Sequence, residues 1–565
     1  MAVPRGSVAL SRALSTLADL ADIRGEASDA ADCRRAAEFI ATLNNPAAAA
    51  LLQRARDDRL QDDPYVPLRA GRRIQELATA GEEATIRASR GTLPSLFRTL
   101  LTLCVVDTNE AALLVRNLGI LTLGDLQRGL ETGRILEIFN ESVDARLRQA
   151  APAIATDAAP LPLGRARELL ESIAIAVGEC APAVDALVPS GDARRFESLV
   201  SDLVLVGRSS DPLTAIEQVS GARGIDEIRH RGSRRVIVST QGSEVDIHVA
   251  TIEEYGTVLF STTGSRAHFQ AMRARTGHVS LVPREEDVYT RGGLPYIAPE
   301  LREDRGEVEA AAAGTLPRLI SVEDIRGDLH MHTMYSDGAD TVDAMVAACC
   351  AIGYQYIAIT DHSERASASR TLARRDLARQ RDDIQRARDR YPQITILHGV
   401  EVDIMPDGTL DFSDRVLESF DIVLASLHES ARHDGKMLTW RCLQAIRHPL
   451  VTIVAHPANR LVGRRAGYPL DYDAVFAEAV ETGTALEVDG GPSHLDLDGE
   501  RAREAVAAGV TLTIDSDCHR ARWLTRQMAM GVGTARRGWV ESRHVLNTRT
   551  LDDVRAFIAA KRARR

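Results

Sequence analysis

The chain has 565 residues and a formal net charge of −11, which is long enough for three or four domains with separate cores. Hydrophobic residues make up 44% of the sequence, yet no run of about 18 apolar residues could span a bilayer. The N-terminus lacks the pattern of a signal peptide. We therefore expect a cytoplasmic globular protein without a membrane partner; the oligomeric state stays open, with a monomer as the simplest expectation.

The negative net charge argues against a protein that coats nucleic acid through bulk charge, although it leaves room for a local basic groove. Arg370 to Arg381 is one basic stretch of that kind. A solvated helix face explains the same stretch equally well.

The first 80 residues show helical periodicity, with Leu10, Leu14 and Leu17 at three- and four-residue spacings. Residues 66–81 and 100–123 each have the pattern of helix, turn, helix. In that arrangement, backbone N–H groups at a helix N-terminus can hold a DNA phosphate. Gly71 is present in the first of the two, whereas the turn at 104–108 has no glycine, so close approach of a phosphate is not expected there.

The middle of the chain changes to short strands at 204–206, 235–238 and 245–249, which predicts a small antiparallel sheet with a few helices. Three carboxylates on neighbouring strands of such a sheet could hold two Mg²⁺ ions for nucleotidyl transfer. The sequence offers Asp202 and Asp246, and Val204 stands where an alternate carboxylate would be needed. Residues 264–314 are predicted to form a small subdomain and a linker.

Beyond residue 321, strands and helices alternate, for example with a helix over 341–352 that is entered at Asp340 and stopped by Gly353. Such alternation of apolar strands with helices predicts an α/β fold, a seven-stranded barrel of parallel strands covered by helices. The predicted strands are 328–332, 356–360, 395–404, 422–428, 451–456, 485–489 and 511–517.

Residue types that bind metals follow six of these strands. In a parallel barrel the carboxyl ends of the strands share one rim, so distant residues converge there. The candidates are His330, His332, His362, Glu401, His428, His456, Asp517 and His519, with Asp337 in the turn after the first strand. His433 and His494 stay open between ordinary polar side chains and contacts to the ligands or the substrate, and we expect His398, His448 and His544 to be structural histidines.

Four short motifs, Asp328–Thr333, Thr360–Ser363, Gly399–Glu401 and Ser516–His519, resemble those of the polymerase-and-histidinol-phosphatase (PHP) superfamily over residues 324–565. The resemblance implies a three-metal cluster with His330, His332, Glu401 and Asp517 as its catalytic residues. These four would hold the first ion; Glu401, His428 and His456 the second; Asp337, His362 and His519 the third. Mixed imidazole and carboxylate ligands suit two or three Mn²⁺ or Zn²⁺ ions better than Mg²⁺ alone.

The segments Tyr255–His268 and Leu294–Arg302 are similar to those of bacterial family X DNA polymerases (PolX), which join a polymerase core to a C-terminal PHP exonuclease. This resemblance implies DNA as the partner, at 3′ ends, gaps or nicks. It also implies a domain order: a helical N-terminal domain that resembles the family's 8-kDa domain (1–85), a helical region with a degenerate helix-hairpin-helix and fingers (86–180), a polymerase X-like palm (181–265), a thumb-like subdomain and linker (266–320), and a PHP domain (321–565).

The palm departs from the family pattern at two places. Gly191–Arg195 carries Asp192 where the family has a serine, and Asp202 is followed by Val204 in place of the second carboxylate. Asp202 and Asp246 alone do not suit a pair of Mg²⁺ ions. We therefore predict a metal-dependent 3′–5′ exonuclease or 3′-end-processing phosphoesterase with a degenerate polymerase site. The alternatives are an active polymerase with exonuclease, a small-molecule phosphatase similar to histidinol phosphatases, and a non-catalytic DNA-repair scaffold.

Overall fold

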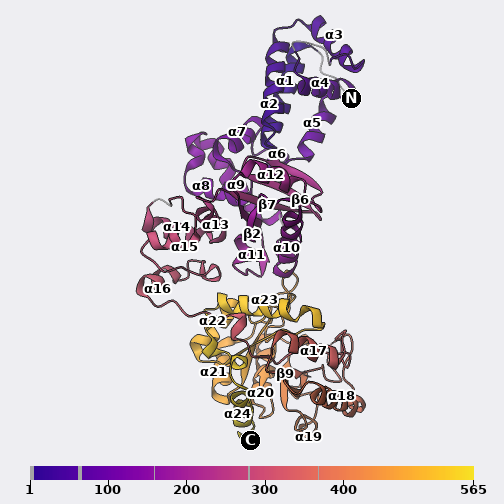
Figure 1. Cartoon of the computed structure of the whole chain (residues 1–565), viewed down its shortest axis with the longest axis vertical. Coiled ribbons are helices and arrows are strands. Elements are labelled where there is room, and N and C mark those ends of the chain that lie inside the picture. The colour runs from indigo at the N-terminus through magenta and orange to yellow at the C-terminus, as the bar shows by residue number, and fades with distance from the viewer. Residues whose placement is uncertain (1–5, 61–65, 158–159, 278–279, 367, 565) are drawn as a thin grey trace.

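The computed structural model describes residues 6–60, 66–157, 160–277, 280–366 and 368–564. The molecule is elongated, with the N-terminal helices at one end and the C-terminal barrel at the other (Figure 1). Within the described ranges, no helix combines the length and the apolar character that crossing a bilayer requires.

The N-terminal part is all helical and is organised around one buried cluster that runs from Leu10 to Ile154. Helices α1 and α2 form its centre, with α3 and α4 at the outer end and α7, α8 and α9 below them (Figure 1). The helices are α1 (Ser7–Ile23), α2 (Ala27–Ala41), α3 (Asn45–Arg56), α4 (Leu68–Thr79), α5 (Glu82–Gly91), α6 (Ser95–Thr102), α7 (Thr108–Leu118), α8 (Leu123–Glu131) and α9 (Glu141–Asp157).

One of the two predicted helix-turn-helix segments is wrong. Residues 66–81 contain the single unbroken helix α4, and Gly71 lies inside it, facing Leu60 and Val66. That glycine allows close packing and makes no turn. The second segment does form helix, turn, helix, and Asp107 in its turn accepts a hydrogen bond from the N–H of Glu110 in a capping box that starts α7.

The middle of the chain contains a five-stranded sheet in the order β2-β4-β7-β6-β5, and we call this region the palm after the domain expected there. The expected antiparallel sheet is in fact mixed, because α12 (Pro212–Ser220) carries the chain from β4 to the far edge and β7 returns parallel to β4. A separate two-stranded ribbon joins β1 and β3. The elements are β1 (Leu161–Pro162), α10 (Leu163–Cys180), β2 (Asp185–Pro189), α11 (Gly191–Arg194), β3 (Leu199–Val200), β4 (Leu203–Arg208), β5 (Glu227–Arg231), β6 (Arg235–Thr240) and β7 (Ser243–Ala250).

The segment between palm and barrel is held by buried polar pairs. His268 lies between Glu307 (Nδ1 to Oε1, 2.5 Å) and the Tyr289 hydroxyl (3.0 Å). The fully buried Arg302 donates to Glu285 at 2.5 Å. His268 and Arg302, which end the two segments that resemble PolX, therefore both have structural partners. The helices here are α13 (Tyr255–Thr263), α14 (Arg266–Thr276), α15 (Glu285–Arg291) and α16 (Glu307–Ala313).

The C-terminal part is the predicted α/β barrel of seven parallel strands in sequential order from β8 to β14. Its edges nearly close, because Met331 bridges Cys518 and the N–H of Leu329 donates to Asp515 at 2.7 Å. The first and fifth strands are shorter than predicted, since the chain bends away before the candidate ligands. The strands are β8 (Gly327–Asp328), β9 (Tyr356–Ile359), β10 (Thr395–Asp403), β11 (Ile422–Ser426), β12 (Ile453–Val454), β13 (Ala485–Asp489) and β14 (Leu512–Asp515).

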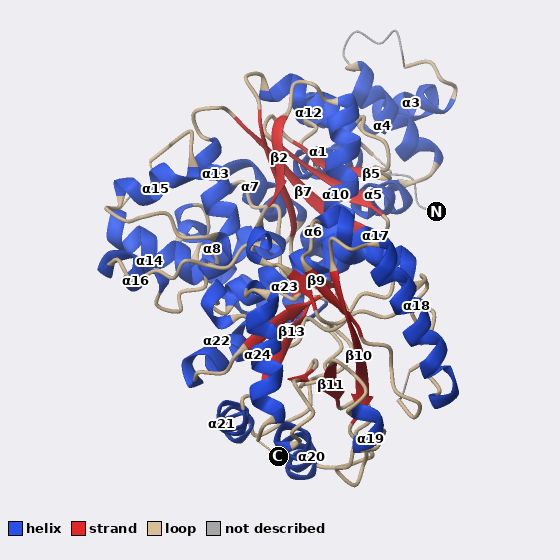
Figure 2. Cartoon of the chain, turned by 60° about the horizontal axis from the view of Figure 1, so that its bottom comes forward, coloured by secondary structure: helices blue, strands red, loops and turns tan. Residues whose placement is uncertain are grey.

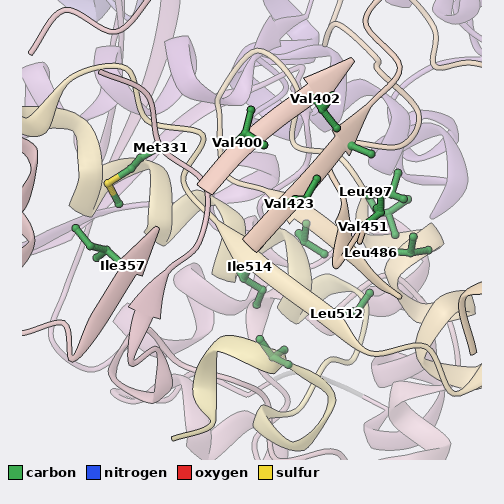
Figure 3. Packing of buried hydrophobic residues seen from close by; sticks show 14 of the residues in the cluster. Met331, Ile357, Val400, Val402, Val423, Val451, Leu486, Leu497, Leu512 and Ile514 are labelled. Atoms are coloured by element: carbon green, nitrogen blue, oxygen red, sulfur yellow. The ribbon is translucent and has the colours of Figure 1, made fainter. Parts of the chain in front are cut away.

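Side chains alternate along the barrel strands, as a period of two requires. Val400 and Val402 of β10 pack outward into the main apolar cluster (Figure 3), while Glu401 between them points into the barrel. The outer cluster is covered by α17 (Val342–Ile352), α18 (Leu377–Arg390), α20 (Gly435–Arg447), α21 (Tyr472–Thr482), α22 (Gly499–Ala508) and α23 (Leu524–Arg537). Helix α17 matches its prediction, except that Thr341 and not Asp340 caps it.

The other end of the barrel interior is apolar. Leu397 and Leu424 meet Ile558 of α24 (Leu551–Arg562) there, and Figure 2 shows this helix beside the strands. This apolar end lies opposite the rim that carries the candidate ligands.

The palm and the barrel share a core. Val462, Leu495 and Met530 of the barrel belong to the same buried cluster as Leu163 and Val200 of the palm. Helix α23 lies on the side of the barrel that faces the palm (Figure 1).

Candidate metal centre

The nine candidate ligands converge at the polar rim of the barrel, although they span 190 residues of the sequence, from His330 to His519. Donor atoms lie within 4.8 Å of one another in four overlapping groups: His332, Asp337, His362 and His519; His330, His332 and Asp517; His330, Glu401 and His456; and His362, Glu401 and His428. His332 and His362 each belong to two groups. The assignment of each ligand to one particular ion stays a prediction.

Glu401 stands at the middle of the rim and is completely buried. Its Oε2 lies 2.6 Å from Nδ1 of His362 and 3.4 Å from Nε2 of His330. Its Oε1 lies 2.9 Å from Nε2 of His456 and 3.2 Å from Nε2 of His428. One carboxylate therefore faces imidazoles that follow four different strands, which is the arrangement of a bridging ligand.

Asp517 and Asp337 complete the rim on the side of β14. Asp517 Oδ1 is 3.0 Å from Nε2 of His332. Asp337 Oδ1 is 3.2 Å from Nε2 of His519 and 3.4 Å from Nε2 of His362. The ring of His332 stacks on those of both His362 and His519, with centroid separations of 4.3 Å.

A second layer of carboxylates orients the imidazoles. Glu487 lies 2.7 Å from Nδ1 of His330 and accepts the backbone N–H of His456 at 2.8 Å. Asp403 lies 2.6 Å from Nδ1 of His428. Such partners fix which ring nitrogen is free to bind a metal. The sequence analysis missed Glu487, although a charged side chain in the buried strand β13 was a signal that could have revealed it.

Asp361, in the motif Thr360–Ser363, shapes the rim without facing it. Its carboxylate accepts hydrogen bonds from Thr333 N (2.7 Å), Ser336 Oγ (2.5 Å) and Gln380 Nε2 (2.7 Å). These bonds fix the loop that carries Asp337.

The basic stretch from Arg370 to Arg381 contributes to the same loop. Arg370 donates to the backbone carbonyls of Ser336 and Gly338, the residues that flank Asp337. Arg379 is exposed and stacks on Tyr335. Part of the stretch is therefore structural and part faces solvent.

The remaining histidines divide as follows. His494 stacks on His456 with a centroid separation of 5.5 Å, which places it beside the rim. His398 is buried against Gln380 at 2.9 Å, and His448 lies near Asp414 at 3.3 Å. His433 and His544 belong to none of the four donor groups found among the described residues.

The donor set fits divalent cations. Glu401 Oε2, Asp337 Oδ1 and His362 Nδ1 are buried close to other donor groups, yet none makes a well-directed hydrogen bond within the described part of the chain, which is rare for buried polar atoms. Burial alone would raise the pKa of Glu401, yet His362, His428 and His330 outweigh it and hold that pKa well below the ordinary value. An ionised carboxylate among imidazoles is the ligand chemistry of Zn²⁺ or Mn²⁺.

The backbone is also strained at two of the nine positions. His456 has φ 29° and Asp517 has φ 47°, values that residues with a side chain rarely adopt. Such strain is typical of functional sites whose surroundings fix the geometry.

The palm carboxylates are arranged differently. Asp246 lies directly opposite Val204 in the register of β7 and β4, so no second carboxylate faces it from that strand. Arg235 donates to both oxygens of Asp246, at 2.8 and 2.6 Å, and to Asp125 of α8 at 2.8 Å. Burial would raise the pKa of Asp246, but Arg235 and His248 outweigh it and keep the carboxylate ionised.

Asp202 and Asp192, the other two acidic residues of the palm, belong to none of the donor groups found among the described residues. Asp202 is exposed just before β4. Asp192 accepts the N–H of Ser201 at 2.8 Å and a guanidinium N–H of Arg195 at 2.7 Å, so it fixes the turn in which it stands.

Comparison with known proteins agrees with this geometry. Residues 328–460 match the PHP domain family. Over 507 residues the chain is 34% identical to the DNA polymerase/3′-5′ exonuclease PolX of Bacillus subtilis, covering 86% of this chain and 88% of the relative. The chain belongs to the PolX family. As a PolX-family member it keeps the PHP barrel at its C-terminal end.

Relatives of the barrel alone are also found outside PolX. A probable phosphatase of Syntrophotalea carbinolica is 32% identical over 165 residues, which is 28% of this chain and 64% of the relative. The structure of a histidinol phosphate phosphatase from Lactococcus lactis, with zinc, L-histidinol and phosphate, covers 37% of this chain and 94% of its own. Its sequence identity is 17% and its TM-score 0.28.

Proposed function

We propose that the barrel is a metal-dependent phosphoesterase that acts on DNA, as a 3′–5′ exonuclease or 3′-end-processing enzyme in repair. The observation that carries this proposal is the convergence of nine donor residues around the buried Glu401. Membership of the PolX family supports DNA as the substrate, since the B. subtilis relative is named as a polymerase and 3′–5′ exonuclease.

The proposed ligands are His330, His332, Asp337, His362, Glu401, His428, His456, Asp517 and His519, for two or three Mn²⁺ or Zn²⁺ ions. Bound cations supply charge that neutralises phosphate and activates a water molecule. Glu401 would hold neighbouring ions together through its two oxygens. Glu487 and Asp403 would keep His330 and His428 in the tautomer that presents Nε2 to the site.

For the N-terminal half we propose a PolX-like core that positions DNA and does not polymerise it. The pairing of Asp246 with Arg235 and the presence of Val204 opposite Asp246 support this view, because Mg²⁺ requires carboxylates that are free to bind it. The domain division at 85, 180, 265 and 320 is part of the same proposal.

The test uses purified protein with labelled 3′-hydroxyl, 3′-phosphate and gapped DNA, in Mn²⁺, Zn²⁺ and Mg²⁺. We expect digestion from the 3′ end in Mn²⁺ or Zn²⁺ and its loss in the His330→Ala/His332→Ala variant. Undiminished digestion by that variant would refute the nuclease. A small phosphate monoester in the same assay distinguishes a small-molecule phosphatase, which would hydrolyse it in preference to DNA.

Primer extension with the same gapped DNA and deoxynucleoside triphosphates tests the palm. We expect no extension in Mg²⁺ or Mn²⁺. Extension by the wild-type chain that persists in the His330→Ala/His332→Ala variant would show an active polymerase and overturn this half of the proposal.

A further inference from the structure

A cavity of about 740 Å³ lies between the palm and the barrel, apart from the nine candidate ligands. Its volume is within the roughly 300–1,000 Å³ of ligand sites in proteins. Ser198 and Leu199 of the palm form one wall. The barrel contributes most of the rest, including Arg460, Arg464, Arg465, Tyr468, Asp498 and Arg501.

The palm fixes the part of the barrel that carries the arginines. Residues 461–465 form a tight turn in which Leu461 and Arg465 exchange backbone hydrogen bonds at 3.0 and 2.9 Å. Gly463 at the tip has φ +72°, and a side chain there would meet Leu199 and Pro162 of the palm ribbon. The ribbon therefore packs on the turn and orders it.

The cavity is basic, although the protein as a whole is acidic. Four guanidinium groups line it against the two carboxylates of Asp496 and Asp498. Arg460 is bound to the carbonyls of His494 and Leu495 at 2.8 and 2.6 Å. Arg464 is exposed, and its guanidinium has no hydrogen bond or ion pair to any residue that the structure describes.

A short chain of hydrogen bonds leads from the cavity to the candidate metal centre. Arg465 donates to Asn459 Oδ1 at 3.0 Å, and Asn459 Nδ2 donates to the carbonyl of His428 at 3.0 Å. The Tyr468 hydroxyl donates to the same carbonyl at 3.3 Å. A single layer of side chains thus separates the cavity from a candidate ligand.

We propose that this cavity binds phosphate groups of nucleotides, with Arg464 as the charge that is free to receive them. Guanidinium groups match phosphate geometry, and Tyr468 in the lining adds an aromatic side chain that could contact a base. The cavity would hold a DNA strand beside the metal centre, and this role, unlike the binding itself, rests on the proposed nuclease function.

Binding is tested without the metal centre. Fluorescence anisotropy in EDTA would follow a short 5′-labelled single-stranded oligodeoxynucleotide at several salt concentrations. We expect Arg464→Ala to weaken binding roughly tenfold and to reduce the salt slope by about one, as loss of one phosphate contact does. Arg464→Lys should recover part of the affinity. An affinity and slope equal to wild type in Arg464→Ala would overturn the proposal.

Arg555→Ala is the matched control, since Arg555 is an exposed arginine on α24 at the other end of the barrel. Its affinity should equal that of wild type. A loss equal to that of Arg464→Ala would mean that only overall charge is measured, and the cavity would not be a site.

Competition identifies the source of the phosphate. Displacement of the oligonucleotide by dAMP, with weaker displacement in Arg464→Ala, would indicate a mononucleotide site. Failure of dAMP and inorganic phosphate to compete, with oligonucleotide binding that depends on Arg464, would indicate a strand. Binding that depends on Arg464 in a protein without nuclease activity would sink the proposed function and leave the cavity standing. Nuclease activity together with oligonucleotide binding that does not depend on Arg464 would overturn the proposed cavity site and leave the proposed nuclease standing.

Discussion

The barrel and the palm both place carboxylates on strands of a sheet, but they neutralise them in different ways. In the barrel, Glu401 is surrounded by imidazoles, which can lose a proton and bind a cation. In the palm, Asp246 is bound on both oxygens by the guanidinium of Arg235. An imidazolium can lose its proton to solvent and then bind a metal through the freed nitrogen, whereas a guanidinium stays protonated. The comparison teaches that the partner of a buried carboxylate matters as much as the carboxylate itself when a metal site is proposed.

The largest effect is expected from Glu401→Gln, which keeps the shape of the central ligand and removes its charge. Loss of a residue that only orients a metal ligand costs up to about 100-fold, so digestion of a 3′ end should fall by more than that when the central ligand itself is changed. Elemental analysis should show less bound metal. Glu481→Gln, on the exposed surface of α21, should match wild type. Full activity in Glu401→Gln would show that the charge of this carboxylate is not needed, and the contrast between the carboxylates of barrel and palm would then lose its basis.

The palm gives the next largest effect, on stability. Arg235→Ala leaves the buried Asp246 with His248 as its remaining partner, so the free energy of unfolding should fall by about 3 kcal/mol, the lower end of the cost of breaking a buried ion pair, measured by urea denaturation. Arg234→Ala breaks only an exposed pair with Glu254 and should cost less than about 1 kcal/mol. Equal losses in the two variants would mean that the Asp246 pair is no more important than a surface pair.

A smaller effect is expected from Glu487→Gln, because Glu487 orients His330 without facing the rim. Metal affinity, measured by titration of the metal-free protein, should fall by about 10- to 100-fold. The free energy of unfolding without metal separates this role from a purely structural one, because it should change much less than the affinity. An unchanged affinity would show that the second layer does not orient the imidazoles.

The smallest effect should come from Asp202→Ala, since this carboxylate is exposed and lies outside the pair of Asp246 and Arg235. Stability should stay within about 0.5 kcal/mol of wild type, and digestion should be unchanged. A large loss of digestion would join the palm to the nuclease site.

The sequence was sufficient to place the nine candidate ligands, because parallel strands bring their carboxyl ends to one rim whatever the distances along the chain. The charge of Glu487 within the apolar strand β13 marks that residue as unusual, but the sequence does not show its partner, because Glu487 reaches His330 through the folding of the barrel. Nor could it reveal Arg235, which reaches Asp246 through the register of β6 and β7. The expected helix-turn-helix at residues 66–81 failed because Gly71 marks close packing and not a turn.

Because palm and barrel share a core, the barrel cannot be separated from the rest of the chain without exposing apolar side chains. Val462, Leu495 and Met530 are buried in one cluster with palm side chains. A fragment beginning at residue 321 would expose these three apolar groups to water, and they would favour aggregation of the isolated barrel. The boundary drawn at residue 320 in the sequence therefore does not mark a line along which the molecule can be cut, and a soluble isolated barrel would need polar replacements at these three positions.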